Sequence, residues 1–549
     1  MSFVKKNNKL MFFKYVLCCK TCFLFYVKVI NNFYYAFQRY CIQRLFLPKN
    51  QCGMKKILTS HQTKQLDALT MSAQGISSYE LMERAVHKLY ADMKSYCPDL
   101  DRKNFLVVAG TGNNGGDGLG VARKLKNANL NVSVWFCDFS TRISPECQTN
   151  IDRYGEDEIL FLSRHEMGNL SISDKCIVID AIFGTGLSRS VTGKYAEVIN
   201  IINSSDAEVW SIDIPSGLFG EDNSQNDGAV IKANVTFSIG NRPLSAMFAE
   251  NYRYFGNVRL VDIGHEMKVT EQMECSLYCL EESDVADKIK PRRPFDHKGT
   301  FGHALLLAGG KGKAGAAVMA SRACLRSGVG LLSVSSSDDI CNIMQISVPE
   351  AMYIENWDGN GEKFSAIGIG PGIGVGKSSI SLVDRTLSGE KLIVVDADAI
   401  NVIANNRHLV GKLENCILTP HPKEFERLFG KVGNPFERLR VMSDFSQKHK
   451  SVVLLKGGIT AISLSDGRIL FYIGMNPGIA TGGSGDVLTG IITSLLAQGY
   501  SVDDAAIVGT WIHGEAGKLA TAEYGVISTV ATDIISKIAL VTKRLANIL

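Results

Sequence analysis

After residue 54 the chain alternates between short apolar runs and longer amphipathic segments, and this alternation constrains its fold more than any other feature. Helical patterns, such as that of residues 77–93, accompany the apolar runs. Strands separated by helices form a mostly parallel sheet that helices cover on both faces. The first apolar runs lie at residues 104–110, 131–137, 175–184, 208–217 and 233–240. We therefore expect a three-layer, Rossmann-like α/β/α domain over residues 54–272.

The same alternation resumes after a charged and less periodic bridge at residues 280–302. Helical patterns lie at residues 315–328 and 485–499. Apolar runs of strand length lie at residues 303–310, 330–337, 365–372, 391–399, 416–420, 451–458 and 460–467. The two halves share no visible internal repeat. We expect a second α/β domain over residues 273–549, in tandem with the first.

Residues 1–53 differ from both halves. The first 50 hold nine Lys or Arg and no Asp or Glu, whereas the rest of the chain holds 50 basic and 55 acidic residues, a net charge of −5. A basic apolar segment suits a membrane surface or a transit peptide, but its lysines interrupt any membrane-spanning run. The third alternative, which we favour, is a translation start at Met54. The acidic body argues against a nucleic-acid partner, and the scattered cysteines indicate a reducing compartment, the cytoplasm.

A glycine-rich segment follows the first strand of the first domain. Its Gly110, Gly112 and Gly115 match the turn that binds the pyrophosphate of a dinucleotide. Asp117 opposes a pyrophosphate bound closely at a helix N-terminus, and the paired asparagines supply oxygens of the kind that hard cations prefer. The pattern by itself leaves a dinucleotide cofactor site and a mixed cation and anion site open.

Two further strands of this domain end in a carboxylate. Asp180 precedes a turn over residues 184–190, and Asp213 precedes Ser216. Carboxyl ends of parallel strands face the crevice where ligands bind. Each aspartate alone could be a helix cap. Two of them beside the glycine-rich segment favour a binding site.

Residues 112–123, 178–189 and 211–218 read GNNGGDGLGVAR, VIDAIFGTGLSR and SIDIPSGL. In this order they resemble the epimerase domain that acts on hydrated NADH and NADPH. The resemblance implies potassium ligands at Asn114, Asp180 and Ser216, and a general acid/base at Asp213. It implies substrate contacts by Asn113, Asn114, Gly115, Gly116, Asp117, Gly184, Thr185, Gly186, Leu187, Ser188, Arg189, Ser190 and Asp213. Arg189 would be the charge partner of a phosphate group.

Residues 476–492, NPGIATGGSGDVLTGII, carry the strongest local signal of the second domain. The amides of residues 482–485 at a helix start predict a cradle for phosphate or an oxyanion. Asp486 is positioned to take a proton from a hydroxyl group that attacks a phosphoryl group. A simple helix cap would need fewer glycines.

This segment resembles the glycine–aspartate signature of ribokinase-like folds. Residues 297–331, 367–374, 394–400, 418–428 and 453–462 follow the motif order of the NAD(P)H-hydrate dehydratase family. The resemblance implies that substrate contacts come from Ala304, Gly372, His421 and Asp486. Nucleotide contacts would come from Lys456, Gly457, Gly458, Ile459, Thr460 and Gly485. Asp486 is the implied catalytic group, with magnesium neutralising the phosphates of ADP or ATP.

The resulting prediction is a bifunctional nucleotide-repair enzyme that epimerises hydrated NADH and NADPH and dehydrates the S form. The fused arrangement resembles bacterial forms that use ADP, which favours ADP over ATP. We also expect a homo-oligomer. The alternatives are a small-alcohol kinase of the vitamin-precursor type and a first domain that only binds nucleotides.

Overall fold

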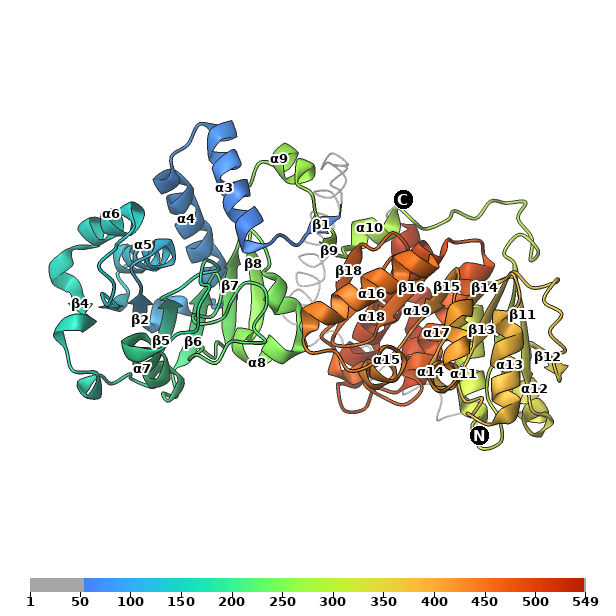
Figure 1. Cartoon of the computed structure of the whole chain (residues 1–549). Coiled ribbons are helices and arrows are strands. Elements are labelled where there is room, and N and C mark those ends of the chain that lie inside the picture. The colour runs from blue at the N-terminus through green and yellow to red at the C-terminus, as the bar shows by residue number, and fades with distance from the viewer. Residues whose placement is uncertain (1–53, 548–549) are drawn as a thin grey trace, which may run out of the picture. The chain divides into compact units, whose positions relative to one another are not determined.

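The computed structural model describes residues 54–547 (Figure 1). Residues 1–53 lie outside the described part, so the expected start at Met54 stays a prediction. The residues from Met54 onward form one compact unit, which contains two sheets. In the described range no helix is both long and apolar enough to cross a membrane.

The first sheet has seven strands in the order β4-β3-β2-β5-β6-β7-β8, and every neighbouring pair is parallel. Its strands are β2 (Asn104–Ala109), β3 (Asn131–Phe136), β4 (Ile159–Phe161), β5 (Cys176–Ala181), β6 (Glu208–Ile212), β7 (Val235–Ile239) and β8 (Asn257–Val261). The alternation of apolar runs predicted this sheet, and the parallel arrangement confirms the expected α/β architecture.

Helices cover both faces of this sheet, because successive strand residues point to opposite sides. Phe105 and Val107 pack against α4 (Ser78–Tyr96) and α5 (Asn113–Asn127). Leu106 and Val108 pack in a second cluster with α7 (Gly193–Asn203). The remaining helices of this half are α3 (Ser60–Gln74), α6 (Pro145–Tyr154), α8 (Tyr252–Phe255) and α9 (Met267–Gln272).

The second sheet has eleven strands in the order β1-β9-β18-β17-β16-β15-β14-β13-β10-β11-β12. Its pairs are parallel from β16 to β12, whereas β17 pairs antiparallel with both β16 and β18. The strands are β1 (Lys55–Lys56), β9 (Leu277–Cys279), β10 (His303–Leu307), β11 (Leu331–Ser336), β12 (Met352–Glu355), β13 (Ala366–Ile369), β14 (Leu392–Val395), β15 (Cys416–Leu418), β16 (Val452–Leu455), β17 (Ile459–Ser463) and β18 (Ile469–Ile473).

One end of this sheet includes residues from the first half of the chain. Strand β1 pairs antiparallel with β9, and β9 pairs parallel with β18. Residues 55 and 56, expected in the first domain, therefore belong to the second sheet. The two halves share this sheet edge as well as a covalent connection.

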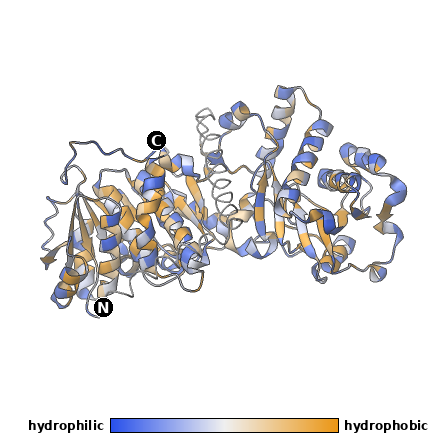
Figure 2. Ribbon diagram, turned by 180° about the vertical axis from the view of Figure 1, so that it is seen from behind, coloured by the Kyte–Doolittle hydropathy of each residue, from blue (hydrophilic) through white to orange (hydrophobic). Residues whose placement is uncertain are grey.

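Helices also cover both faces of the second sheet. One face packs against α11 (Ala314–Arg326), α17 (Ser484–Ala497), α18 (Val502–Tyr524) and α19 (Ala531–Ala546). The other packs against α13 (Lys377–Leu387), α14 (Ala397–Asn405), α15 (Pro422–Phe429) and α16 (Pro435–His449). The short helices α10 (Glu282–Ala286) and α12 (Cys341–Ser347) complete this half. Figure 2 shows the hydrophobic strands enclosed between helices with hydrophilic outer faces.

Candidate active sites

The glycine-rich segment forms the end of β2 and the first turns of α5. Helix α5 begins at Asn113, with Gly112 as its N-cap. A Cβ atom at Gly115 would lie 1.8 Å from the carbonyl oxygen of Gly110, and one at Gly110 would lie 2.1 Å from that of Ile182. Both glycines are therefore needed for close backbone packing. The pattern alone could not separate this reason from a phosphate cradle.

Asp180, at the end of β5, and Ser216, in the turn after β6, form a buried polar pair. The Asp180 carboxylate accepts hydrogen bonds from Ser211 Oγ at 2.7 Å and from the Ser216 backbone N–H at 2.9 Å. Burial, the largest influence, raises the pKa of Asp180, and its hydrogen bonds to serines oppose the rise. The third predicted potassium ligand, Asn114, is also buried.

The Asn114 amide group bears on whether a cation fits here. Its carbonyl oxygen and its amide nitrogen are both buried and have no hydrogen-bond partner in the described structure. An unpaired buried amide costs about 1–3 kcal/mol, so a ligand that engages the oxygen relieves this cost. With the Asp180 carboxylate and the Ser216 hydroxyl, the donor set is oxygen only, as hard cations require. These residues fit a potassium ion.

Asp213 follows β6 in a left-handed backbone conformation, with φ of 69°. Its Oδ2 atom accepts hydrogen bonds from the Thr185 N–H at 2.8 Å and from Thr185 Oγ1 at 3.1 Å. A Cβ atom at Gly184 would lie 2.7 Å from the same oxygen. Strained conformations of this kind cluster at functional sites. The structure thus brings the turn after β5 and the Asp213 carboxylate together.

Three carboxylates share this region of the first domain. Burial raises the pKa of Asp213, and the charge of Asp67 raises it further. Burial also raises the pKa of Asp117 well above its usual value, with added repulsion from Asp213 and Asp67. Asp67 Oδ1 and His265 Nε2 share a hydrogen bond and lie 2.7 Å apart. A carboxylate with a raised pKa is a stronger base, which suits a group that exchanges protons with a substrate.

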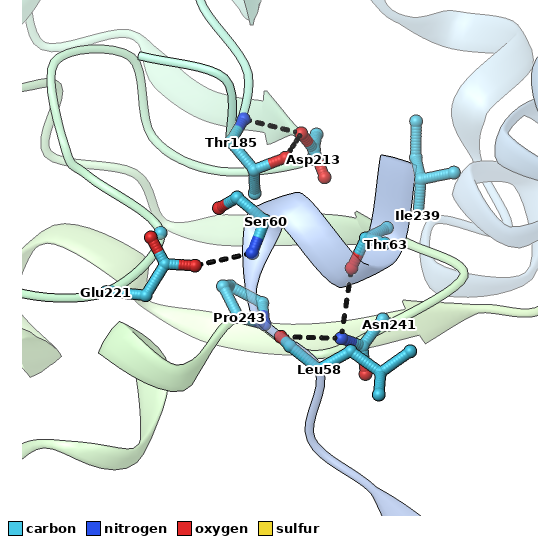
Figure 3. A pocket seen from close by; sticks show the side chains of 10 residues that line it. Leu58, Ser60, Thr63, Thr185, Asp213, Glu221, Ile239, Asn241 and Pro243 are labelled. Carbon is cyan, nitrogen blue, oxygen red and sulfur yellow. Dashed lines mark hydrogen bonds between the residues drawn. The ribbon is translucent and has the colours of Figure 1, made fainter. Parts of the chain in front are cut away.

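A small pocket of about 10 Å³ opens beside Asp213 (Figure 3). Helix α3 forms one wall of it through Ser60 and Thr63, and Asn241 also lines it. Asn241 Nδ2 donates to the Leu58 carbonyl oxygen at 3.1 Å and to Thr63 Oγ1 at 3.4 Å. The Ser60 N–H donates to the Glu221 carboxylate. The pattern of α3 is that of an ordinary surface helix, so the sequence did not predict its place beside Asp213.

The second predicted site lies at the start of α17. Gly483 is the N-cap with φ of 90°, and a Cβ atom there would lie 2.4 Å from Met319 Cε. Asp486 occupies the first turn. Burial, helped by repulsion from Asp396, raises the pKa of Asp486 to about 6, while Lys456 opposes the rise. A carboxylate with this pKa is ionised at neutral pH and is basic enough to accept a proton.

Asp396 connects the predicted nucleotide residue Lys456 to this helix. The buried Asp396 carboxylate accepts hydrogen bonds from Lys456 Nζ at 2.8 Å and from Thr489 Oγ1 at 2.7 Å. A Cβ atom at Gly485 would lie 3.4 Å from Lys456 Nζ. The structure thus places Lys456, Gly485 and Asp486 near one another. Asp396 lies in the motif at residues 394–400, whose pattern did not predict a connection to Lys456.

The other predicted residues of the second domain are placed differently. Gly372 has φ of 71°, and a Cβ atom there would lie 3.2 Å from Lys313 Cβ. His421 is the N-cap of α15, where its Nδ1 atom accepts from the Lys423 N–H at 3.1 Å. Ala304 is fully buried within β10, in the core of this half. The segment from Lys456 forms a turn and the start of β17.

The loop before Asp486 rests on one face of α18. Asn476 Nδ2 donates to Thr521 Oγ1 at 3.0 Å, and His513 Nε2 lies 3.0 Å from both Ser484 Oγ and the Ser484 carbonyl oxygen. Between them, a Cβ atom at Gly517 would lie 2.2 Å from Ile479 Cγ2. Positions 513, 517 and 521 are four residues apart and share a face. This spacing was the missed signal in the sequence.

Burial lowers the pKa of His513 to about 4. The imidazole is therefore neutral at physiological pH, and the geometry allows its Nε2–H to donate to the Ser484 carbonyl oxygen.

No group of three or more His, Cys, Asp or Glu side chains suited to a metal ion occurs within residues 54–547.

Comparison with known proteins covers both sites. A family described as NAD(P)H-hydrate dehydratase matches residues 304–540, and one described as YjeF-related protein N-terminus matches residues 78–242. The bifunctional NAD(P)H-hydrate repair enzyme Nnr of Moorella thermoacetica is 32% identical over 514 residues, covering 89% of this chain and 97% of the relative. This chain belongs to the family of bifunctional NAD(P)H-hydrate repair enzymes.

Another relative is the Escherichia coli enzyme of this family, which is 31% identical over 470 residues, with 84% of this chain and 89% of the relative covered. Among solved structures, the ADP/ATP-dependent NAD(P)H-hydrate dehydratase from Bacillus subtilis, crystallised with ATP and Mg²⁺, is 29% identical. It covers 48% of this chain and 97% of its own, with a TM-score of 0.43. Helix α3 lies before the matched N-terminal range.

Proposed function

We propose that this chain repairs hydrated NADH and NADPH in two steps, at two separate sites. The first domain interconverts the R and S hydrates, and the second dehydrates the S form at the expense of ADP or ATP. The observation that carries the proposal is that one chain contains both predicted sets of site residues and aligns with 97% of a bifunctional relative. Coupling is useful because epimerisation supplies the isomer that the second site consumes.

In the epimerase site, Asp213 is the proposed general acid/base at the hydroxylated carbon of the nicotinamide ring. Its raised pKa and its fixed bonds to Thr185 support this role. Asn113–Asp117 and the turn over residues 184–190 would contact the nucleotide, with Arg189 beside a phosphate group. Potassium, held by Asn114, Asp180 and Ser216, would supply positive charge next to a buried carboxylate.

In the dehydratase site, Asp486 takes the proton from the substrate hydroxyl group, whose oxygen attacks the terminal phosphoryl group of the nucleotide. The hydroxyl group becomes a phosphate ester, and a shortened nucleotide leaves. Loss of phosphate, together with a proton from the neighbouring ring carbon, restores the double bond. The amides of residues 482–485 would stabilise the transferred phosphoryl oxygens.

Lys456 and the turn over residues 457–460 would contact the nucleotide, supported by the closeness of Lys456 Nζ to Gly485. Ala304, Gly372 and His421 are proposed substrate contacts, on the family resemblance alone. Magnesium would neutralise charge on the nucleotide phosphates. We take ADP as the preferred donor, since the fused arrangement resembles that of bacterial ADP-dependent enzymes.

The test follows the absorbance of reduced nicotinamide. Mixed R and S NADH hydrate is incubated with magnesium and either ADP or ATP. Full recovery is expected, and the nucleotide that gives the faster recovery is the donor. Recovery that stops near half would contradict the epimerase assignment. No recovery with either nucleotide, or a stable phosphorylated product in the mass spectrum, would favour a small-alcohol kinase instead.

We further propose a homo-oligomer in a reducing compartment, the cytoplasm. All nine cysteines among the described residues have free thiols, as in proteins of reducing compartments. Ile343, Ile346 and Met352, on α12 and the end strand β12, are exposed apolar side chains that support self-association. Light scattering coupled to gel filtration tests the oligomer, and a monomeric mass would contradict it.

A further inference from the structure

Helix α3 presents a polar stripe to the epimerase site. Ser60, Thr63, Lys64 and Asp67 are spaced i, i+3, i+4 and i+7, the spacing of one helix face. Ser60 and Thr63 line the pocket with Asp213, and the charge of Asp67 acts on Asp213. Three of the four members of the stripe therefore lie along the site, and the fourth is Lys64.

Lys64 does reach the site, at the turn over residues 184–190. A Cβ atom at Gly186 would lie 3.3 Å from Lys64 Nζ. The lysine side chain therefore extends from α3 across to the turn that is proposed to hold a substrate phosphate. Gly186, with no side chain, leaves the space that the ammonium group occupies.

Neither Lys64 nor Arg189 has an anionic partner within residues 54–547. The ion pairs of the described structure include neither residue. Asp67, the nearest carboxylate along the stripe, is engaged by His265. One glycine-rich turn thus has two cations that lack a carboxylate partner. Lys64 reaches the turn from α3, and Arg189 belongs to the turn itself.

The acidic groups of the site explain why cations are needed beside the substrate. Asp67, Asp117 and Asp213 place three carboxyl groups close together, and repulsion from Asp67 contributes to the raised pKa of the other two. A dinucleotide substrate carries negative phosphates, which such a cluster repels. A lysine beside the phosphate turn offsets this repulsion and supplies a charge-assisted hydrogen bond.

We propose that Lys64 is a substrate-binding residue of the epimerase site, which pairs with a phosphate group of the hydrated nucleotide opposite Arg189. Helix α3 is then a wall of the substrate site as well as part of the scaffold. This inference rests on the epimerase function proposed above. The phosphate belongs either to the pyrophosphate, present in both hydrates, or to the 2′-phosphate, present only in NADPH hydrate.

The experiment measures epimerase kinetics on the R hydrates of NADH and NADPH. Product is followed with ADP, magnesium and an excess of the Asp213→Asn chain, whose dehydratase site is intact. For Lys64→Ala we expect KM to rise roughly tenfold, the size of one charge-assisted hydrogen bond, with kcat within about twofold. Lys64→Arg restores most of the affinity. The matched control is Lys88→Ala, which removes an exposed lysine of α4.

A higher KM for both hydrates supports the proposal and identifies the pyrophosphate. A higher KM for NADPH hydrate alone supports it and identifies the 2′-phosphate. Unchanged KM for both substrates, in a Lys64→Ala chain that keeps its dehydratase activity, overturns it. If the unmodified chain itself lacks epimerase activity, the proposed function fails rather than the role of Lys64.

Discussion

The dehydratase reaction should lose activity in mild acid, because its proposed base titrates near pH 6. Burial of the Asp486 carboxyl group, with repulsion from Asp396, raises its pKa from 3.8 to about 6. Only the ionised carboxylate can accept the proton of the substrate hydroxyl group. Lowering the pH therefore removes the active form of the enzyme.

The size of the effect follows from the ionised fraction. With a pKa of about 6, roughly one tenth of Asp486 is ionised at pH 5, against roughly nine tenths at pH 7. We expect kcat to fall roughly tenfold over this interval. A carboxyl group at its ordinary pKa would stay almost fully ionised, and kcat would barely change.

The assay follows recovery of reduced-nicotinamide absorbance from the S form of NADPH hydrate at saturating nucleotide, between pH 5 and 8. Acid decay of the product is subtracted with blanks that lack enzyme. The control is Asp466→Asn, which removes an exposed carboxylate in the turn between β17 and β18. A kcat at pH 5 within twofold of its value at pH 7 would refute a catalytic base that titrates near pH 6.

The same pKa makes a prediction about stability. Because the folded-state pKa is raised, ionised Asp486 destabilises the fold above about pH 6, and this penalty is absent below pH 3.8. At 1.36 kcal/mol per pKa unit, the rise corresponds to about 3 kcal/mol. Asp486→Asn should therefore raise the free energy of unfolding by at most this amount at pH 7, with the gain vanishing toward pH 4. Denaturant unfolding measures it, and a gain independent of pH would contradict the cause.

Three further predictions concern residues at the two sites. Gly517→Val places a side chain against Ile479, with its Cβ atom 2.2 Å from Ile479 Cγ2. We expect dehydratase kcat to fall roughly a hundredfold while epimerase activity is retained. Equal loss of both activities would indicate general misfolding. Gly184→Ala brings a Cβ atom to 2.7 Å from Asp213 Oδ2; epimerase kcat should fall roughly tenfold or more, and an unchanged rate would contradict the role of this turn. Replacing potassium by lithium should lower epimerase activity, and Asn114→Ala should remove that dependence, because its unpaired carbonyl oxygen is the proposed ligand; an Asn114→Ala chain that still responds to potassium would contradict the assignment.

The sequence predicted the two α/β halves and placed the key carboxylates. Alternating apolar runs determine strands and helices locally, and carboxyl ends of parallel strands must meet at one edge. Asp180, Asp213 and their neighbouring turns could therefore be grouped from the strand pattern alone. The order of motifs separated the first site from a dinucleotide cofactor site, which the glycine pattern alone leaves open.

Other features depended on which segments pack together over long distances. Strand β1 joins the second sheet through β9, more than 200 positions later in the chain, and a two-residue strand carries no periodic signal. The motifs that contain Ala304 and His421 did not predict the surroundings of these residues. Ala304 is buried in β10, and His421 caps α15. Motif order identifies a family, whereas burial and capping are set by the neighbours that surround a residue.

The sequence by itself determined the fold class, the family and the residues that follow strand ends. Only the tertiary structure decided that α3 and α18 lie beside the two candidate sites. Each helix carries its relevant residues at helical spacing, a pattern also found on any solvated or packed face. Lys64 and His513 are distinguished from other residues on these faces by their contacts. Lys64 lies beside Gly186, and His513 lies beside Ser484. Such partners are far away in sequence, so their contacts arise only when the chain has folded.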